Sequence, residues 1–226
     1  MMIARFFDIL FSGLAIVALS PMLVPLVIVL LFTGEGKVFF RQERIGKGVR
    51  TFKLLKFATM LENSPNIGTR TITTKNDPRI LPVGRLLRKA KINELPQLLN
   101  IFLGDMSIIG PRPLTNETFS FYPRQTQSSI SSLRPGLSGI GSIVFRNEEE
   151  IIQTQQNAKE FYASEIAPYK GELEKWYVSK ANIVIYFALI FLTVWVVLFP
   201  NSKIVWKTFK SLPTPPLSLR TNLGCD

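Results

Sequence analysis

The 226-residue sequence contains no histidine and a single cysteine, Cys225, next to the C-terminus. These absences exclude nucleophilic triads of the Ser-His-Asp and Cys-His kinds, and zinc sites built from histidine and cysteine. One cysteine also cannot form a disulfide within the chain. The chemistry that remains belongs to carboxylates, hydroxyls, lysine and arginine, with a hard cation such as Mg²⁺ as a compatible partner. This set of groups points to phosphate chemistry.

Acidic residues are scarce, since 16 Asp and Glu stand against 27 Lys and Arg, for a net charge of +11. Such a charge suits an anionic bilayer surface, an anionic nucleotide substrate or nucleic acid. Nucleic acid ranks last, because no zinc-finger or RNA-binding aromatic signature accompanies the basic residues. Hydrophobic residues make up 46% of the chain, so we expect contact with membrane lipid.

Charge is absent between Ile9 and Gly34, an apolar run that is too long for a signal peptide and long enough to cross a bilayer. Ser20-Pro21 and Pro25 interrupt it. Proline removes a backbone donor, so we expect the helix to break near the bilayer midplane, with Ser20 bonding a freed carbonyl. Arg5 precedes the run, and four basic residues follow it between 37 and 47. Because basic flanks prefer the cytoplasmic side, re-entry is favoured over a span.

A second hydrophobic run, Ile183 to Phe199, ends at Pro200. It is short for a spanning helix and long for a soluble surface helix. Tyr186 and Trp195 are of the types that gather at membrane interfaces, so we interpret the run as embedded in or lying on the membrane, with a spanning helix as the alternative. The Pro-rich tail beyond Leu212 is expected to be poorly ordered.

The region between the two apolar runs has mixed patterns. Val38–Gln42 and Thr51–Phe57 alternate around a Gly46/Gly48 turn, which predicts a β-hairpin. Further patterns predict a polar loop at Asn63–Asn76, helices at Asp77–Lys89 and Glu117–Tyr122, a short strand at Ser142–Phe145, and amphipathic helices over Glu148–Tyr177 with a break at Pro168. The fold class expected is therefore α+β and mostly helical.

The stretch Lys91–Pro113 carries the strongest local signals. Asn93 is a suitable N-cap, so a helix is predicted from Glu94, and Gly104 is placed to end it. Its predicted apolar face consists of Leu95, Leu98, Leu99 and Phe102. A helix N-terminus stabilises phosphate oxygens, and Glu94 there is a candidate metal ligand.

Arg112 stands between two prolines, which fix the backbone and so lower the cost of aiming its guanidinium fork at a phosphate. Structural explanations stay open for both residues: Glu94 can simply favour the helix dipole, and Arg112 can form an ion pair. Further along, the glycines of the turn at Arg134–Gly139 permit close approach by a ligand or another backbone. The cluster of basic residues around Arg88 is also typical of ordinary helix-dipole compensation.

Several of these stretches together resemble the monotopic phosphoglycosyl transferases, a family of bacterial sugar transferases. They are the Ser-Pro pair in the first apolar run, FFRQERIG, KFATM, NDPRILPVGRLLRK, NELPQLLN, GDMSIIGPRP, RPGLSGIGS and KWYV. The resemblance covers Arg5 to Lys207, and GDMSIIGPRP after ELPQ is its most specific part.

The resemblance implies a monotopic enzyme on the cytoplasmic face of the bacterial inner membrane. It would transfer a phosphosugar from a UDP-sugar to polyprenyl phosphate with Mg²⁺ and release UMP, at the start of capsule, O-antigen or exopolysaccharide synthesis. A homodimer or downstream glycosyltransferases are further partner candidates. The segments expected are a re-entrant helix (1–35), a catalytic domain (36–182), a membrane-embedded or interfacial helix (183–200) and the C-terminal tail (201–226).

The family's active site has an Asp-Glu pair at the position of Asn93-Glu94, in which the aspartate forms a covalent phosphosugar and the glutamate binds Mg²⁺. An amide is a far poorer nucleophile than a carboxylate, so Asn93 departs from this pattern, as does Ala58, where an arginine is common. Losing one charge of each sign avoids an unpaired buried charge. The predicted site comprises Asn93, Glu94 and Arg112 as catalytic residues and Lys56, Arg88, Arg146 and Gly139 as phosphate or uridine contacts.

Three interpretations follow from the departure at Asn93. The first is an active transferase in which polyprenyl phosphate attacks the UDP-sugar directly, or in which another carboxylate such as Glu94 or Glu148 is the nucleophile. The second is an impaired membrane-bound relative that binds nucleotide sugar or a partner glycosyltransferase. The third is a basic adaptor on the membrane surface, which leaves the agreement at GDMSIIGPRP unexplained.

Overall fold

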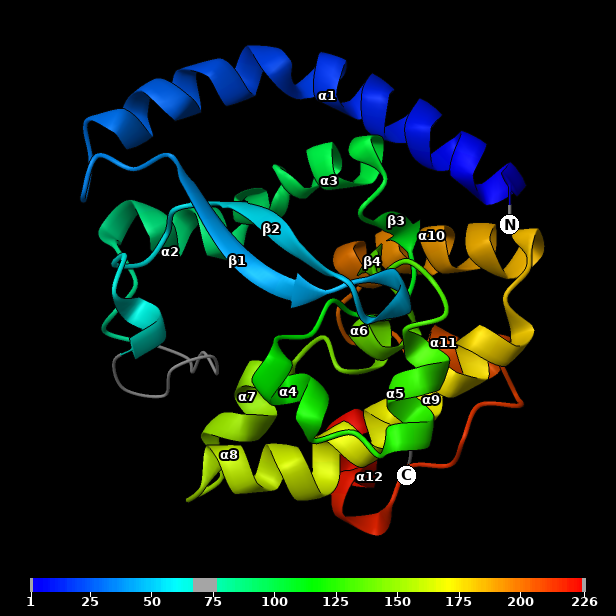
Figure 1. Ribbon diagram of the computed structural model, residues 1–226. Helices are drawn as coiled ribbons and strands as arrows, with labels where there is room; N and C mark the ends of the chain where they lie inside the picture. Colours follow the sequence, from blue (N-terminus) through cyan, green and yellow to red (C-terminus); the bar gives the residue numbers. More distant parts are fainter. Residues whose placement is uncertain (1, 67–76, 225–226) are drawn as a thin grey trace.

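The computed structural model describes residues 2–66 and 77–224. One long helix, α1 (Met2–Leu31), lies across one end of the molecule, and the hairpin and the shorter helices fill the space below it (Figure 1). Among the described residues, α1 is the one helix that is long and apolar enough to cross a membrane. The expected class, a mostly helical α+β domain associated with a membrane, is confirmed.

The predicted break in α1 is wrong, because the helix runs through Pro21 and Pro25 as a single curved element (Figure 1). Pro21 leaves the carbonyl of Val17 without its usual donor. The Ser20 hydroxyl donates to that carbonyl at 2.7 Å, as the sequence predicted. The lost bond is therefore replaced locally, and the helix bends without ending.

Polar bonds fix the first turns of α1 to three other elements: α3 (Gln97–Leu103), β3 (Ser107–Ile109) and α10 (Ile183–Leu198). Asp8 is buried, and its carboxylate accepts from the Ser107 hydroxyl at 2.8 Å, the Ile108 N–H at 2.9 Å and the Tyr186 hydroxyl at 2.8 Å. Arg5 donates to the carbonyls of Ile101 and Phe102 at the end of α3. At the other end of α1, Leu30 packs with Phe57 and Leu87. Both ends of α1 thus contact the same domain.

The predicted hairpin is confirmed by β1 (Phe39–Ile45) and β2 (Thr51–Phe57), which pair antiparallel from Phe39↔Phe57 to Ile45↔Thr51. A second, parallel pair joins β3 to β4 (Gly136–Ser138). The glycine turn makes this pair possible, since a Cβ at Gly139 would lie 2.2 Å from the carbonyl oxygen of Gly110. The close approach predicted there is made by another part of the backbone.

The helix expected from Asp77 begins later, as α2 (Pro82–Lys89), because Asp77 and Arg79 form a buried ion pair in the preceding loop. The strand expected at Ser142–Phe145 is wrong. That segment is α6 (Ile140–Val144), in which Ile140 and Ile143 are buried at helical spacing. The helix near Glu117 is confirmed as α4 (Asn116–Ser120), and α5 (Arg124–Ile130) follows it. Most of the polar loop predicted at Asn63–Asn76 lies outside the described residues.

The predicted helices over Glu148–Tyr177 are present as α7 (Glu148–Gln153), α8 (Ala158–Phe161), a π-helical turn (Tyr162–Ile166) and α9 (Ala167–Lys180). The break is not at Pro168, which starts α9 directly after the π turn and therefore interrupts no regular bond. The helical structure is interrupted between α7 and α8 instead.

Helix α10 has a buried face along its length, formed by Tyr186, Leu189, Leu192 and Val196. The opposite face is exposed, so α10 packs on the domain along one side only, and its placement in or on the membrane, with a spanning helix as the alternative, stays a prediction. The expectation of a poorly ordered tail is wrong for residues 213–224, which the structure describes as ordered. The tail forms α12 (Leu217–Leu223) after α11 (Ile204–Thr208), with Leu219 fully buried and the Tyr169 hydroxyl donating to the carbonyl of Pro213 at 2.8 Å.

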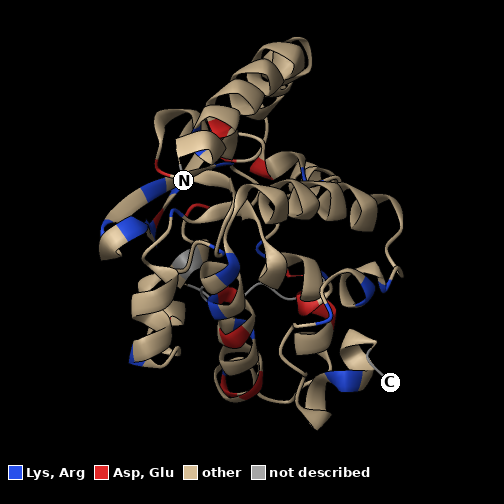
Figure 2. Ribbon diagram, turned by 90° about the vertical axis from the view of Figure 1, so that its right-hand side faces the viewer, with Lys and Arg blue, Asp and Glu red and all other residues tan. Residues whose placement is uncertain are grey.

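Large apolar side chains remain exposed on α1, α3 and α10. We call the surface formed by these exposed side chains the apolar face. Its exposed members include Phe6, Leu14, Val17, Val24, Leu103, Val184, Phe191 and Val197. Figure 2 shows that α1 and α10 carry almost no charged residue, whereas charges of both signs cover the helices on the other side. An exposed apolar surface of this extent is typical of a membrane contact.

Candidate active site

The predicted helix start at Glu94 is corrected by the structure. Residues Ile92–Glu94 form a 3₁₀ turn that begins after Lys91, which adopts a left-handed φ of 57°. Helix α3 begins at Gln97 and its cap position is Pro96, so Asn93 caps nothing. Gly104 ends α3 with φ 103°, as predicted. The apolar face of α3 is also rotated from prediction, since Ile101 is fully buried whereas Phe102 is 45% exposed.

Asn100 of α3 holds this segment against the hairpin. Its amide oxygen accepts from the Leu55 N–H at 2.9 Å, and its amide nitrogen donates to the carbonyl of Lys53 at 3.0 Å. The 3₁₀ turn therefore meets β2, and the Lys56 ammonium lies 3.5 Å from Glu94 Oε1. Two of the residues predicted from separate motifs thus form one ion pair.

The electrostatics of this pair favour the charged forms at neutral pH. Burial acts to raise the pKa of Glu94, but Lys56, Arg112 and Lys91 outweigh it and lower the pKa to about 2. The pKa of Lys56 falls to about 8, because burial disfavours the ammonium ion more than Glu94 favours it. Glu94 is therefore an ionised carboxylate surrounded by cations.

Arg44, which sequence reasoning missed as a site residue, adds a further buried cation. Its guanidinium donates to the carbonyl of Pro113 at 3.1 Å and to the side chain of Gln42 at 2.5 Å. Burial and the charge of Arg112 lower the pKa of Arg44 to about 10. The signal available in the sequence was its place in FFRQERIG, where Arg44 follows Gln42 by two residues and so lies on the same face of β1.

Arg112 is linked to a buried ionic cluster on α9. Its backbone N–H donates to Glu174 Oε1 at 3.4 Å. Burial acts to lower the pKa of the Arg112 guanidinium, but the charges of Glu148 and Glu94 raise it. Lys170, which is 1% exposed, pairs with Glu148. Among the described residues Arg112 forms no salt bridge within 4.0 Å, so the alternative of a structural ion pair lacks support, although the charges of Glu94 and Glu148 act on its guanidinium.

Glu174 and its surroundings were also missed from the sequence. Burial raises the pKa of Glu174 to about 7, against the opposing effects of Lys170 and Arg112. Gly141 makes room for the carboxylate, because a Cβ there would lie 2.4 Å from Glu174 Oε1. The signal in the sequence was the polar pair Lys170 and Glu174, four residues apart on a helix face otherwise buried through Leu173 and Tyr177.

Four buried polar atoms lack a hydrogen-bond partner among the described residues: Arg44 Nε, Asn93 Oδ1, Arg146 Nη1 and Glu174 Oε2. All four belong to segments that carry the predicted site or its ionic cluster. Buried polar atoms are normally paired, and an orphaned one calls for an explanation such as an absent ligand. Arg44 Nε and Arg146 Nη1 are donors that an anionic ligand can use, whereas Asn93 Oδ1 and Glu174 Oε2 can accept from its polar hydrogens, so these atoms make the region a candidate binding site.

The remaining predicted residues take different places. Arg88 lies at the edge of the site, where its charge helps to lower the pKa of Lys56 and its guanidinium reaches Glu149 Oε1 at 3.4 Å. Arg146 follows α6, with one guanidinium nitrogen buried. Gly139 packs against the backbone of Gly110, so the structure explains that glycine by packing.

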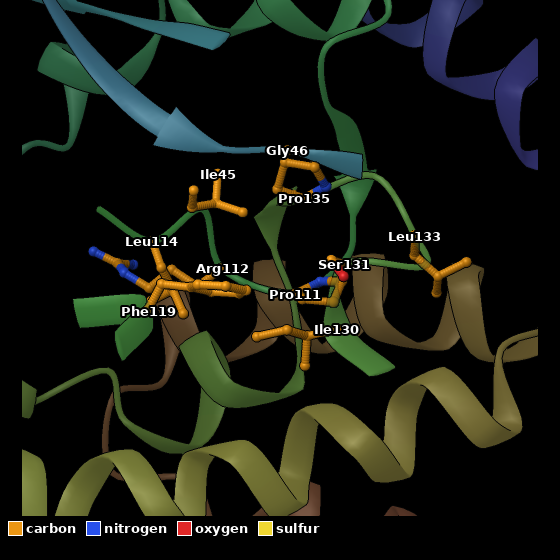
Figure 3. Close-up of a pocket in the computed structure, with 10 residues that line it drawn as sticks. All are labelled: Ile45, Gly46, Pro111, Arg112, Leu114, Phe119, Ile130, Ser131, Leu133 and Pro135. Carbon is orange, nitrogen blue, oxygen red and sulfur yellow. The ribbon is translucent and has the colours of Figure 1, made fainter. Parts of the chain in front are cut away.

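A small crevice of about 20 Å³ lies behind Arg112, between Pro111, Pro135, Ile130 and the end of β1 (Figure 3). In Figure 3 the guanidinium of Arg112 extends past Leu114 and away from Pro135 and Ser131. The crevice is therefore on the backbone side of the loop, and the arginine fork points elsewhere.

The described residues include no group of three or more His, Cys, Asp or Glu that could hold a metal ion. Mg²⁺ does not need such a cage, since it is commonly bound through one or two carboxylates, substrate phosphates and waters. Glu94 offers one ionised carboxylate beside cations that suit phosphate oxygens. The donor set therefore fits Mg²⁺ when a diphosphate is bound, and does not fit a free metal site.

Comparison with known proteins finds relatives of this chain. The exopolysaccharide production protein ExoY of Sinorhizobium fredii is 39% identical over 158 residues, which cover 64% of this chain and 70% of that protein. The UDP-N-acetylgalactosamine-undecaprenyl-phosphate N-acetylgalactosaminephosphotransferase of Aeromonas hydrophila is 37% identical over 144 residues. The UDP-glucose:undecaprenyl-phosphate glucose-1-phosphate transferase of Klebsiella pneumoniae is 32% identical over 166 residues.

These matched segments cover 63% and 71% of this chain, but only 34% and 35% of the Aeromonas and Klebsiella proteins. The match to the family described as bacterial sugar transferase extends over residues 1–200. It includes α1, the hairpin, the loop that carries Arg112, the ionic cluster on α9, and α10. On this match, the chain belongs to the bacterial sugar transferase family.

Proposed function

We propose that this protein transfers a phosphosugar from a UDP-sugar to polyprenyl phosphate, with release of UMP, as the first membrane step of a bacterial glycoconjugate such as an exopolysaccharide. The relatives named for undecaprenyl-phosphate sugar phosphotransfer support this reaction. The observation that carries the proposal is the ionised Glu94 amid Lys56, Arg44 and Arg112, next to orphaned buried polar atoms.

The residues of the site have separable roles in this proposal. Glu94 would hold Mg²⁺ together with the diphosphate oxygens of the donor, and the ion would supply neutralisation of the charge on those oxygens. Arg112 and Arg146 would donate to the same oxygens as charge-assisted hydrogen bonds, for which the arginine fork is suited. Lys56, Arg44 and Arg146 lie partly out of water, which strengthens their effect on charge that develops during transfer.

Asn93 directs the proposal toward a single displacement. A phosphate oxygen of polyprenyl phosphate would form a bond to the sugar-bearing phosphorus as the bond from that phosphorus to the UMP oxygen breaks. Lys56, Arg44 and Arg112 would offset the negative charge of both groups. The alternative function, an impaired relative that binds nucleotide sugar or a partner glycosyltransferase, is favoured only by the absence of a carboxylate at residue 93.

We also infer that α1 is re-entrant and that the protein lies on the cytoplasmic face of the inner membrane. The contacts of Asp8 at one end of α1 and of Leu30 at the other, both with the same domain, support this topology. Cysteines at Met2 and Lys37, introduced singly with Cys225→Ser, should react with an impermeant label from the cytoplasmic side only. Labelling from opposite sides would overturn the inference.

The test of the reaction is release of UMP by the purified chain with polyprenyl phosphate, Mg²⁺ and a panel of UDP-sugars. We expect release with one donor or a few, and only when polyprenyl phosphate is present. Binding of UDP-sugar without UMP release, under conditions where the Aeromonas relative is active, would select the impaired relative.

A further inference from the structure

A cavity of about 240 Å³ lies between the end of α1 and the start of α2. Its walls are largely apolar and include Leu30, Ala58, Leu81 and Val83, with Gly34 and Lys37 at the connection from α1. Its volume is somewhat below that of pockets for whole drug-sized ligands, so it suits a short segment of a longer ligand. Figure 1 shows the two elements beside each other at the end of α1 farthest from the N-terminus.

Two glycines shape this cavity. Gly34 has a left-handed φ of 59°, and a Cβ there would lie 2.7 Å from a terminal carbon of Leu81. Gly84 lets α2 touch the hairpin, since a Cβ there would lie 2.2 Å from the carbonyl oxygen of Thr59. The Leu81 N–H donates to that same carbonyl at 2.9 Å. The cavity is thus bounded by a tight backbone junction and is part of the fold.

The cavity lies next to the phosphate-binding cations. Ala58 continues the hairpin past β2, with its N–H donating to the carbonyl of Val38 at 2.9 Å. It is two residues from Lys56, which is roughly 7 Å along an extended chain. A ligand whose anionic head reaches Lys56 can therefore extend its next atoms along Ala58 into the cavity.

The cavity also adjoins the apolar face. Leu30 lines it, and Ile28, Val29, Leu31 and Phe32 next to it are between 47% and 86% exposed. The nearest cation on the wall, Lys37, already pairs with Glu62. An apolar chain that comes from the membrane is therefore better matched to these walls than a sugar or a nucleotide base, whose polar groups would lack partners.

We propose that this cavity binds the isoprene units next to the phosphate of the lipid acceptor, with that phosphate at Lys56. The proposal rests on the proposed function and adds to it a place for the acceptor. It separates the two substrates in space. The donor diphosphate lies by Glu94 and Arg112, and the acceptor reaches Lys56 from the cavity beside the end of α1. Burial of apolar chain atoms provides the affinity, and Lys56 provides the position.

The first test is cross-linking without UDP-sugar. Full-length protein in nanodiscs is irradiated with a polyprenyl phosphate that carries a diazirine in the isoprene units next to the phosphate. Adducts located by mass spectrometry should fall on Leu30, Ala58 or residues 81–84. Adducts elsewhere would overturn the proposal. Equal labelling of the same residues by a diazirine phospholipid would overturn it too, because the cavity would then be a general acyl-chain site.

Variants make the test quantitative. Ala58→Phe and Val83→Phe fill the cavity from opposite walls, whereas Leu86→Phe enlarges a side chain that is 68% exposed on the same helix and serves as the control. Each filling variant should lower the cavity cross-link about tenfold or more, since a displaced isoprene unit loses several buried carbons. The control should match the unaltered protein. Unchanged cross-linking in both filling variants, with melting temperatures retained, would contradict the proposal.

Kinetics separates this proposal from the proposed function. In an active protein, the KM for polyprenyl phosphate should rise about tenfold in the filling variants while the KM for UDP-sugar stays constant. Absence of UMP release from the unaltered protein, together with cross-links in the cavity, would refute the reaction and leave the lipid site standing. UMP release with cross-links elsewhere would support the reaction and refute the lipid site.

Discussion

Two carboxylates on opposite sides of α3 show how differently this chain treats buried charge. Asp8 of α1 is 2% exposed and accepts from Ser107, Ile108 and Tyr186, so its neighbours complete its bonding. Among the described residues Glu94 pairs with Lys56 at 3.5 Å, and the amide oxygen of the adjacent Asn93 has no hydrogen-bond partner. The first arrangement is closed and serves the fold. The second is incomplete without a ligand, which is what a binding site requires.

The largest effect on stability should come from removing the Asp8 carboxylate. Asp8→Ala leaves three donors without their acceptor, at roughly 1–3 kcal/mol each, so we expect a loss of about 3–9 kcal/mol in the free energy of unfolding. Thermal unfolding in detergent measures it. Asp105→Ala is the control, because Asp105 is exposed and accepts from Asn100 at 3.1 Å. A loss in Asp8→Ala no larger than in the control would show that the cluster does not hold α1.

Glu174 should give the next largest effect, and it depends on pH. Burial raises its pKa to about 7 from the ordinary 4.5, so between these values the folded protein keeps a proton that the unfolded chain has lost. Stability from this group is full below about pH 4.5 and is lost as pH rises through 7, by about 3 kcal/mol at most.

Glu174→Gln should remove that decline, because the amide does not titrate. Melting temperatures measured between pH 4.5 and 8 should therefore fall less in Glu174→Gln than in the unaltered protein. Glu172→Gln, on the exposed side of the same helix, should follow the unaltered curve. Parallel curves for all three proteins would mean that Glu174 titrates normally.

Arg112→Lys sharpens the comparison at the incomplete site. Lysine keeps the charge and loses the bidentate fork, so kcat/KM should fall about ten- to a hundredfold with little change in stability. Arg50→Lys, an exposed change in the hairpin turn, should leave activity intact. Full activity in Arg112→Lys, with the same Mg²⁺ dependence, would remove Arg112 from the phosphate site.

Asn93 should have the smallest effect in its simplest variant. Because the structure shows no cap at Asn93, Asn93→Ala should lose no more than one hydrogen bond to substrate, about 1 kcal/mol or under tenfold in rate. Asn93→Asp restores a nucleophile and should produce a covalent phosphosugar adduct with UDP-sugar alone, detectable by mass spectrometry. The unaltered protein should show none at residue 93. An adduct on Glu94 or Glu148 would identify a different nucleophile.

The sequence predicted the elements whose patterns are local and long. Alternation around Gly46 and Gly48 predicted the hairpin, and two uncharged runs predicted α1 and α10. The prediction of short elements failed where tertiary contacts determine the secondary structure. Ser142–Phe145 contains four residues that suit a strand or a helix turn equally, and the burial of Ile140 and Ile143 selects the helix. Asn93 is a good cap by type, but the left-handed Lys91 starts a 3₁₀ turn before it.

For the site too, local signals were predicted and long-range contacts were missed. Glu94 and Arg112 were predicted from local signals, Lys56 was added by the family resemblance, and the structure brings their charges together. Arg44, Lys170 and Glu174 were missed because their significance comes from burial, which depends on chain segments far away in sequence. Glu174 lies 62 residues from the Arg112 N–H that it accepts from. No local sequence pattern identifies the partner of Glu174. The polar residues Lys170 and Glu174 within an otherwise apolar helix face indicate only that some buried partner exists.

The anchoring of α1 at both ends has a mechanical consequence. In the proposed re-entrant topology, α1 is tied to one domain at Asp8 and at Leu30, so it displaces lipid from a single leaflet, as an inserted wedge does. Wedges of this kind bind more strongly where lipid packing is loose or the surface is curved. The amount of this protein on a vesicle should therefore rise with packing defects in the leaflet that it enters, independently of any substrate. The lipid composition of that leaflet would then set how much protein the membrane holds.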